Sequence, residues 1–183
     1  MQSIVNKLSK YILSGELIIV PTDTVYGLVC RYDSRKAVDK IYKLKKRDRK
    51  KPLILLGYNW NALKRFVKLT RQQVRVIHEL PLQKLWPGPL TLVLPASKHV
   101  PVYLNKRFKT IGIRVPKNRF LLSLLKHCPE KVLASTSANI SGKKDVKEIA
   151  QKVKLFVMAK KGEMSGKPSK IVEIIDSKTK ILR

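Results

Sequence analysis

The chain has 183 residues, of which 44% are hydrophobic and 28% charged, as in an ordinary globular protein that buries a sizeable core. No apolar run approaches the roughly 20 residues of a membrane span, and the alternating N-terminus lacks the apolar segment of a signal peptide. The formal net charge of +28 attracts phosphates, but its basic residues are scattered, so charge alone does not distinguish a phosphate-binding surface from solvated lysines.

Hydrophobic periodicity predicts helices and strands that alternate along the chain. The first part shows a helix over 3–13, a strand at 17–20, a helix over 34–44 capped by Ser34, a strand at 52–56 and helices near 60–68 and 70–80. The second part shows strands within 87–95 and 110–116, a helix from its cap Asn118 to Leu125, a strand at 131–135, a helix over 145–153, strands at 155–158 and 170–175, and a turn at 176–179. We therefore expect one α/β domain over residues 1–183, built around a mixed sheet.

The segment PTDTVYGL at 21–28 directly follows the first predicted strand. Thr22, Asp23 and Thr24 are short polar residues at the strand's end, and Gly27 permits close approach of the backbone. Ligands of open α/β sheets lie in crevices at strand ends, so this segment is a candidate binding turn. On the residues alone, the favoured alternative is a strand-to-helix turn with capping hydroxyls.

Seven basic residues lie within positions 43–51, immediately before the strand at 52–56. Such a run is usually a solvated face or an arm that contacts nucleic acid. Because Lys45 and Arg47 are two positions apart, an extended backbone would direct both side chains to one side, whereas a helix would splay them. The point charge of the lysine ammonium and the planar pair of donors of the arginine guanidinium together suit a polyphosphate.

The stretch LASTSANISG at 133–142 gathers hydroxyl and amide groups from Ser135, Thr136, Ser137, Asn139 and Ser141. Neutral donors of this kind bind phosphate oxygens. Taken alone, the stretch is more typical of a polar turn. It also contains the N-linked sugar-acceptor pattern, which begins at Asn139.

Other signals exclude several familiar chemistries. Cys30 and Cys128 form no C-x-x-C pair, which favours a reducing cytoplasm and makes the sugar-acceptor pattern accidental. The segment GEMSGKPS at 162–169 imitates a phosphate loop, but it has one residue too few between its glycines and leads into a strand. The histidines lack metal-ligand spacing, so no metal site held by protein side chains is expected. With only 12 acidic residues, phosphate electrostatics is a more attractive basis for a mechanism than carboxylates.

Six strings in one order resemble the YrdC/TsaC family, the threonylcarbamoyl-AMP synthases of tRNA modification. They are PTDTVYGL, Lys45-x-Arg47 before KPLILL, WPGPLTLVLP, IGIRVP, STSANISG, and KPSKIVE with the terminal ILR, and they span residues 17–183. The length resembles the short, single-domain branch of the family. The resemblance implies a twisted, open sheet of parallel and antiparallel strands, flanked by helices, with a basic concave face.

The resemblance also implies an activity. Members of the family condense L-threonine, bicarbonate and ATP to threonylcarbamoyl-AMP and release pyrophosphate, which is a nucleotidyl transfer. Partner proteins then transfer the threonylcarbamoyl group to adenosine 37 of tRNAs that read codons beginning with A. ATP is thus an expected substrate, with Mg²⁺ on its phosphates rather than on protein ligands.

Matching the motifs residue by residue implies roles for nine side chains. Lys45 and Arg47 would hold the phosphates, and Ser137 and Asn139 would complete the phosphate cradle. The remaining five are assigned to ATP and substrate binding: Thr22 and Thr24 near threonine or its carbamate, Arg114 at the substrate carboxylate, Ser169 at the nucleotide, and Ser135 in the same pocket.

The chain departs from the family pattern at three positions. Asp48 stands where proline is common, so it either adds a negative charge beside the cationic pair or faces solvent. Lys170 and Glu173 replace the usual residues of a PSTIVD-like segment, which leaves Ser169 in place but removes a threonine hydroxyl.

Two other functions fit the same residues. A non-catalytic RNA-binding module would use the same basic concave surface, and direct tRNA or RNA binding is also compatible with the enzyme because relatives have been associated with RNA. A carbamoyl-adenylate module like that of hydrogenase-maturation proteins is the other alternative, although that domain is normally embedded in a much longer chain.

Overall fold

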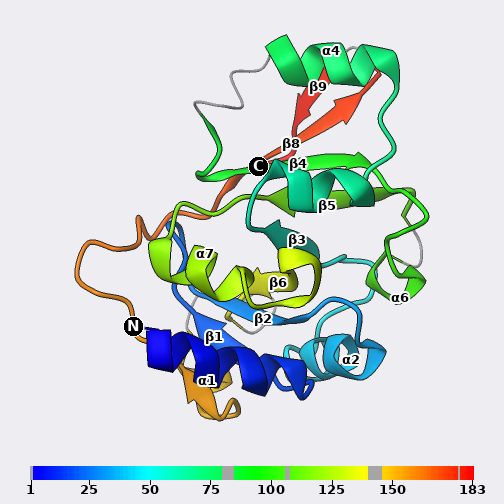
Figure 1. Ribbon diagram of the computed structural model, residues 1–183. Helices are drawn as coiled ribbons and strands as arrows, with labels where there is room; N and C mark the ends of the chain where they lie inside the picture. The colour runs from blue at the N-terminus through cyan, green and yellow to red at the C-terminus, as the bar shows by residue number, and fades with distance from the viewer. Residues whose placement is uncertain (1, 80–84, 106–107, 140–145, 177) are drawn as a thin grey trace.

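The computed structural model describes residues 2–79, 85–105, 108–139, 146–176 and 178–183, and the strands within these ranges form one sheet (Figure 1). The order across the sheet is β7-β1-β2-β6-β3-β5-β4-β8-β9. The strands are β1 (Ile18–Val20), β2 (Gly27–Arg31), β3 (Ile54–Gly57), β4 (Leu90–Pro95), β5 (Thr110–Arg114), β6 (Val132–Ser137), β7 (Leu155–Phe156), β8 (Lys170–Ile175) and β9 (Lys178–Ile181). Three neighbouring pairs, β1–β7, β3–β5 and β4–β8, are parallel and the others antiparallel. The predicted mixed α/β sheet is confirmed.

The helices are α1 (Gln2–Leu13), α2 (Arg35–Leu44), α3 (Trp60–Leu63), α4 (Arg71–Glu79), α6 (Val102–Asn105), α7 (Arg119–Leu125) and α8 (Lys147–Ala150), with 3₁₀ turns η1 (Lys64–Phe66) and η2 (Pro129–Lys131). Both predicted caps are confirmed. Ser34 Oγ accepts the N–H of Ala37 at 3.3 Å, and Asn118 Oδ1 accepts the N–H of Leu121 at 2.8 Å. Among the described helices, none is long and apolar enough to cross a membrane.

Helices cover both faces of the sheet, and Figure 1 shows α1 and α7 in front of it. On that face, apolar residues of α1 and α7 form one core with alternate residues of β1, namely Ile18 and Val20. Ile19, between them, belongs to the core on the opposite face, which α2, α3, α4 and α6 cover. The alternation of side chains along each strand therefore divides the apolar residues between two cores.

Three segments differ from the sequence prediction. The buried run GLVCR is β2, an antiparallel neighbour of β1, so the strand-to-helix alternative for PTDTVYGL is wrong and the segment joins two strands. The turn predicted at 176–179 is shorter, because β9 already begins at Lys178. The short helix α6 was not predicted, since four residues give too little periodicity to detect.

Candidate active site

The turn between β1 and β2 is held by its own hydroxyl groups. Thr22 Oγ1 accepts the main-chain N–H of Thr24 at 3.0 Å and donates to the carbonyl oxygen of Val25 at 2.7 Å. The two threonine hydroxyls are 2.9 Å apart. Since a hydroxyl has one proton, Thr24 is the donor in that contact. Both side chains are buried, at 4% and 1% exposure, so these predicted site residues first of all shape the turn.

Arg114, at the end of β5, lies against this turn. Its Nη1 donates to Thr24 Oγ1 at 2.9 Å, its Nε donates to the carbonyl oxygen of Gly88 at 3.0 Å, and its Nη2 pairs with Asp23 Oδ1 at 2.6 Å. Burial lowers the pKa of Arg114, and the adjacent Asp23 carboxylate opposes that shift. The sequence placed Asp23 at the end of the strand but assigned it no function. Its position between Thr22 and Thr24 was the only sequence signal that it belongs to the site.

Ser169 extends the same cluster from the start of β8. Its Oγ lies 2.9 Å from Thr91 Oγ1 on β4, and its carbonyl oxygen accepts the Nε–H of Arg183 at 3.2 Å. The charge of Arg183 also lowers the pKa of Arg114, which puts the two guanidinium groups within electrostatic reach. Thr91 and Arg183 were not among the predicted site residues, although the terminal ILR string contained the arginine.

Lys45 lies in a second part of the candidate site, and its backbone is helical rather than extended. Helix α2 runs to Leu44, Lys45 caps it with φ −84° and ψ −4°, and Lys46 is left-handed with φ 48°. The Lys45 side chain, 1% exposed, donates to the carbonyl oxygens of Ser137 and Asn139 and lies 3.4 Å from Asn139 Oδ1. The helix end thus brings three of the predicted cradle residues together.

Burial of the Lys45 ammonium lowers its pKa to about 8, and the charge of Arg47 contributes further. An ordinary lysine is charged well above that pH. A strongly shifted titratable group is typical of functional sites, although structural ion networks produce such shifts too.

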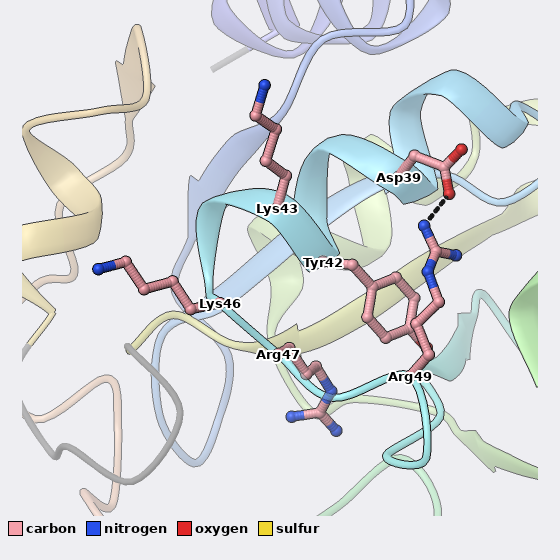
Figure 2. Close-up of a pocket in the computed structure, with 6 residues that line it drawn as sticks. All are labelled: Asp39, Tyr42, Lys43, Lys46, Arg47 and Arg49. Atoms are coloured by element: carbon pink, nitrogen blue, oxygen red, sulfur yellow. Dashed lines mark hydrogen bonds and ion pairs between the residues drawn. The ribbon is translucent and has the colours of Figure 1, made fainter.

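The Arg47 side chain is half-buried and binds the backbone of the following turn. Its Nε donates to the carbonyl oxygen of Lys51 at 2.8 Å and its Nη2 to that of Pro52 at 3.1 Å, and burial lowers its pKa. Arg47 also lines a shallow hollow of about 410 Å³ (Figure 2). The hollow is bounded by the side chains of Asp39, Tyr42, Lys43, Lys46, Arg47 and Arg49.

The cations of this hollow are spread rather than focused on one point. Figure 2 shows the side chains of Lys43, Lys46 and Arg47 diverging. Arg49 lies over the ring of Tyr42, with its Cζ 4.8 Å from the ring centroid, and pairs with Asp39 at 2.5 Å. Such an open, basic surface suits an extended polyanion better than a single small ion.

Strand β6 connects the two clusters. Ser137, whose carbonyl oxygen binds Lys45, is the register partner of Gly27 on β2. A Cβ atom on Gly27 would lie 3.4 Å from Ser135 Oγ and 3.5 Å from Thr22 Cγ2, so both of those side chains lie beside this glycine. The turn after β1 therefore lies beside β6, the strand whose last residue contacts Lys45.

The structure also bears on the other segments that the sequence analysis singled out. Asp48 is exposed and its Oδ1 accepts the N–H of Lys50 at 2.8 Å, so it faces solvent and shapes a turn. GEMSGKPS precedes strand β8 and not a helix, which agrees with its rejection as a phosphate loop. Ser141 and the first residue of the helix predicted over 145–153 lie outside the described residues, and the described helix in this range, α8, is shorter, at Lys147–Ala150. Within the described part of the chain, no group of three or more potential metal ligands occurs.

Comparisons with known proteins identify the family of this chain. The family model Sua5_yciO_yrdC, described as "Telomere recombination", matches residues 10–183. The chain belongs to this family. A threonylcarbamoyl-AMP synthase of Buchnera aphidicola is 36% identical over 174 residues, covering 89% of this chain and 87% of the relative. One from Vibrio campbellii is 34% identical and covers 95% of each chain.

Solved structures of the Sua5/YciO/YrdC family share the fold. The crystal structure of P. abyssi Sua5 complexed with L-threonine superposes with a TM-score of 0.81 at 28% identity. The match covers 98% of this chain but 53% of that one, so this chain spans about half of the P. abyssi protein. The family resemblance drawn from the six sequence strings is confirmed.

Proposed function

We propose that this chain is a threonylcarbamoyl-AMP synthase, a nucleotidyltransferase that condenses L-threonine, bicarbonate and ATP. The buried Lys45 ammonium beside the end of β6 carries the proposal, because it holds a positive charge against the carbonyl oxygens of Ser137 and Asn139, whose side chains would supply the neutral donors. The curated relatives bear the synthase name, and a related structure holds L-threonine. All described strands share one sheet, which supports one domain over residues 1–183.

The proposed reaction brings two anions together. An oxygen of the threonine carbamate attacks the α-phosphorus of ATP, the bond from that phosphorus to the bridging oxygen breaks, and pyrophosphate leaves. Lys45 and Arg47 would lower the repulsion between the anions, and Ser137 and Asn139 would supply neutral donors to phosphate oxygens. Arg114 would hold the threonine carboxylate near the turn that contains Thr22 and Thr24. Mg²⁺ would enter with ATP.

Pyrophosphate release tests the proposal. Purified chain should release pyrophosphate from ATP and Mg²⁺ only when both L-threonine and bicarbonate are present. Omitting each component in turn supplies the controls, and one of the Vibrio or Buchnera synthases is the positive control. No release where the positive control is active would refute the synthase. Release that depends on carbamoyl phosphate instead would indicate a carbamoyl-adenylate module.

The product is expected to serve proteins that transfer the threonylcarbamoyl group to tRNA.

The basic hollow beside α2 favours a second function, direct RNA binding. It lies on the 43–51 run, which carries seven basic residues, and its cations diverge over an open surface (Figure 2). Contacts to phosphates should make the affinity for single-stranded RNA fall with salt, with a logarithmic slope of roughly −0.7 per neutralised phosphate. Replacing Lys43 and Lys46 together by alanine should reduce that slope. A slope equal to that of the unmodified chain would remove this surface from RNA binding.

A further inference from the structure

Asp23 and Arg114 form the most deeply buried ion pair among the described residues. Their side chains are 12% and 5% exposed, and the Oδ1–Nη2 distance is 2.6 Å. The other carboxylate oxygen, Asp23 Oδ2, is buried and has no hydrogen-bond partner in the described part of the chain. Desolvating two charges and leaving one oxygen unsatisfied offsets the attraction between them. Stability alone therefore does not account for the pair.

The contacts of Arg114 leave a defined part of its guanidinium group for a ligand. Its five N–H groups include three that donate to Gly88, Thr24 and Asp23. Those three bonds use one N–H on each nitrogen, so each terminal nitrogen has a second N–H. Two N–H groups on neighbouring nitrogens match the two oxygens of a carboxylate.

Asp23 is itself fixed from several directions. Its Oδ1 also accepts the main-chain N–H of Lys117 at 3.0 Å. Its carbonyl oxygen accepts the N–H of Ser165 at 3.1 Å, and the carbonyl of Thr24 accepts the N–H of Gly166 at 2.8 Å. The carboxylate therefore sits in a rigid frame that joins the 21–28 turn, the end of β5 and the segment before β8.

We infer that Asp23 is a positioning residue that sets the plane of the Arg114 guanidinium for the carboxylate of an amino-acid substrate. The inference rests on the proposed function, because that function supplies threonine as the amino acid. Asp23 does not contact the substrate, since its unpaired oxygen is buried within the protein. It acts through Arg114, and the phosphate-binding residues around Lys45 do not depend on it.

Asp23→Asn tests this role, because it removes the charge and keeps an oxygen for the Arg114 contact. We expect the KM for L-threonine in pyrophosphate release to rise about tenfold or more, as when a charge-assisted contact weakens. The KM for ATP should change by less than about twofold. The matched control is Asp33→Asn, which removes another Arg–Asp pair, with Arg31 at 2.8 Å, at the opposite end of β2. That control should leave both constants unchanged.

A double-mutant cycle with Arg114→Lys decides whether Asp23 acts through Arg114. In the Arg114→Lys background, Asp23→Asn should raise the threonine KM by less than about twofold further. Additive effects, or equal rises in the KM for threonine and ATP, would show a general structural role and overturn the inference. A wild-type threonine KM in Asp23→Asn would also overturn it, while leaving the synthase intact.

Two further outcomes would lead to different conclusions about the synthase and about Asp23. If the unmodified chain releases no pyrophosphate, the proposed function fails and this inference fails with it. If Asp23→Asn is unfolded by thermal melting, Asp23→Glu replaces it, because it keeps the charge and shifts the carboxylate by one methylene. A wild-type threonine KM in Asp23→Glu would then contradict a requirement for exact positioning of Arg114.

Discussion

The ammonium group of Lys45 donates a hydrogen bond to the main-chain carbonyl oxygen of Asn139, 94 positions later in the chain. This bond ties the end of α2 to the residues that follow β6. It joins a charged side chain to backbone, so it fixes the segment that carries Asn139 whichever side chain stands there. Lys45 is therefore expected to act in two ways, through its charge and through the shape of that segment.

Activity should depend on the charge of Lys45. Because burial lowers its pKa to about 8, we expect kcat/KM for ATP to fall as pH rises through about 8. Lys45→Arg should lack this inflection, since a guanidinium stays charged across the range. A pH–rate profile of the two proteins provides the measurement. The same inflection in Lys45→Arg would assign the titration to another group.

The free energy of unfolding should rise with pH, whereas activity should fall. The pKa of Lys45 is about 8 in the folded chain and 10.5 for an ordinary lysine, so between those values the unfolded chain binds more protons. The contribution of Lys45 to the free energy of unfolding should therefore rise between pH 8 and 10.5. Urea unfolding of the wild type and Lys45→Met at several pH values isolates this contribution. A falling difference would contradict it.

Arg47→Ala should reduce catalysis more than stability. Its loss should cost on the order of 2–4 kcal/mol of transition-state stabilisation if it holds the phosphates. The fold should persist because Arg47 is only half-buried and its partners are two carbonyl groups of one turn. Arg49→Ala, which removes a neighbouring cation of the same hollow, is the matched control. Unchanged kcat/KM in Arg47→Ala would remove this arginine from the site.

Asn139→Ala separates the side chain from the backbone contact. The main-chain bond to Lys45 remains possible, whereas the amide group that would bind a phosphate oxygen is lost. We expect the KM for ATP to rise by about tenfold with little change in melting temperature. A large loss of melting temperature with intact kinetics would instead assign Asn139 a structural role.

The sequence predicted the mixed sheet because its strands and helices depend on local patterns. Short continuous apolar runs marked buried strands such as β3, and Ser34 and Asn118 marked helix starts. The family strings then placed Lys45, Ser137 and Asn139 in one site, and the structure brings these three together.

What the sequence could not predict depends on contacts between distant residues. The spacing of Lys45 and Arg47 did not reveal that Lys45 ends helix α2 in a helical conformation and that Lys46 is left-handed, which fixes where the Lys45 side chain points. The ion pair of Asp23 and Arg114 joins residues 91 positions apart, and no local pattern signals such a contact. Strand order has the same origin, since β2 lies between β1 and β6 only in the folded chain.

Gly112, in the middle of β5, should tolerate no side chain because of its neighbour Ile54. The two residues are register partners on parallel strands, and a Cβ on Gly112 would lie 2.7 Å from Ile54 Cγ2. A β-branched side chain has little freedom to move aside, so Gly112→Ala should lower the free energy of unfolding by about 1–3 kcal/mol. Urea unfolding measures the loss. Ile54→Ala removes the obstructing methyl group, so Gly112→Ala should cost less in that background. An equal cost in both backgrounds would show that the clash with Ile54 is not the cause.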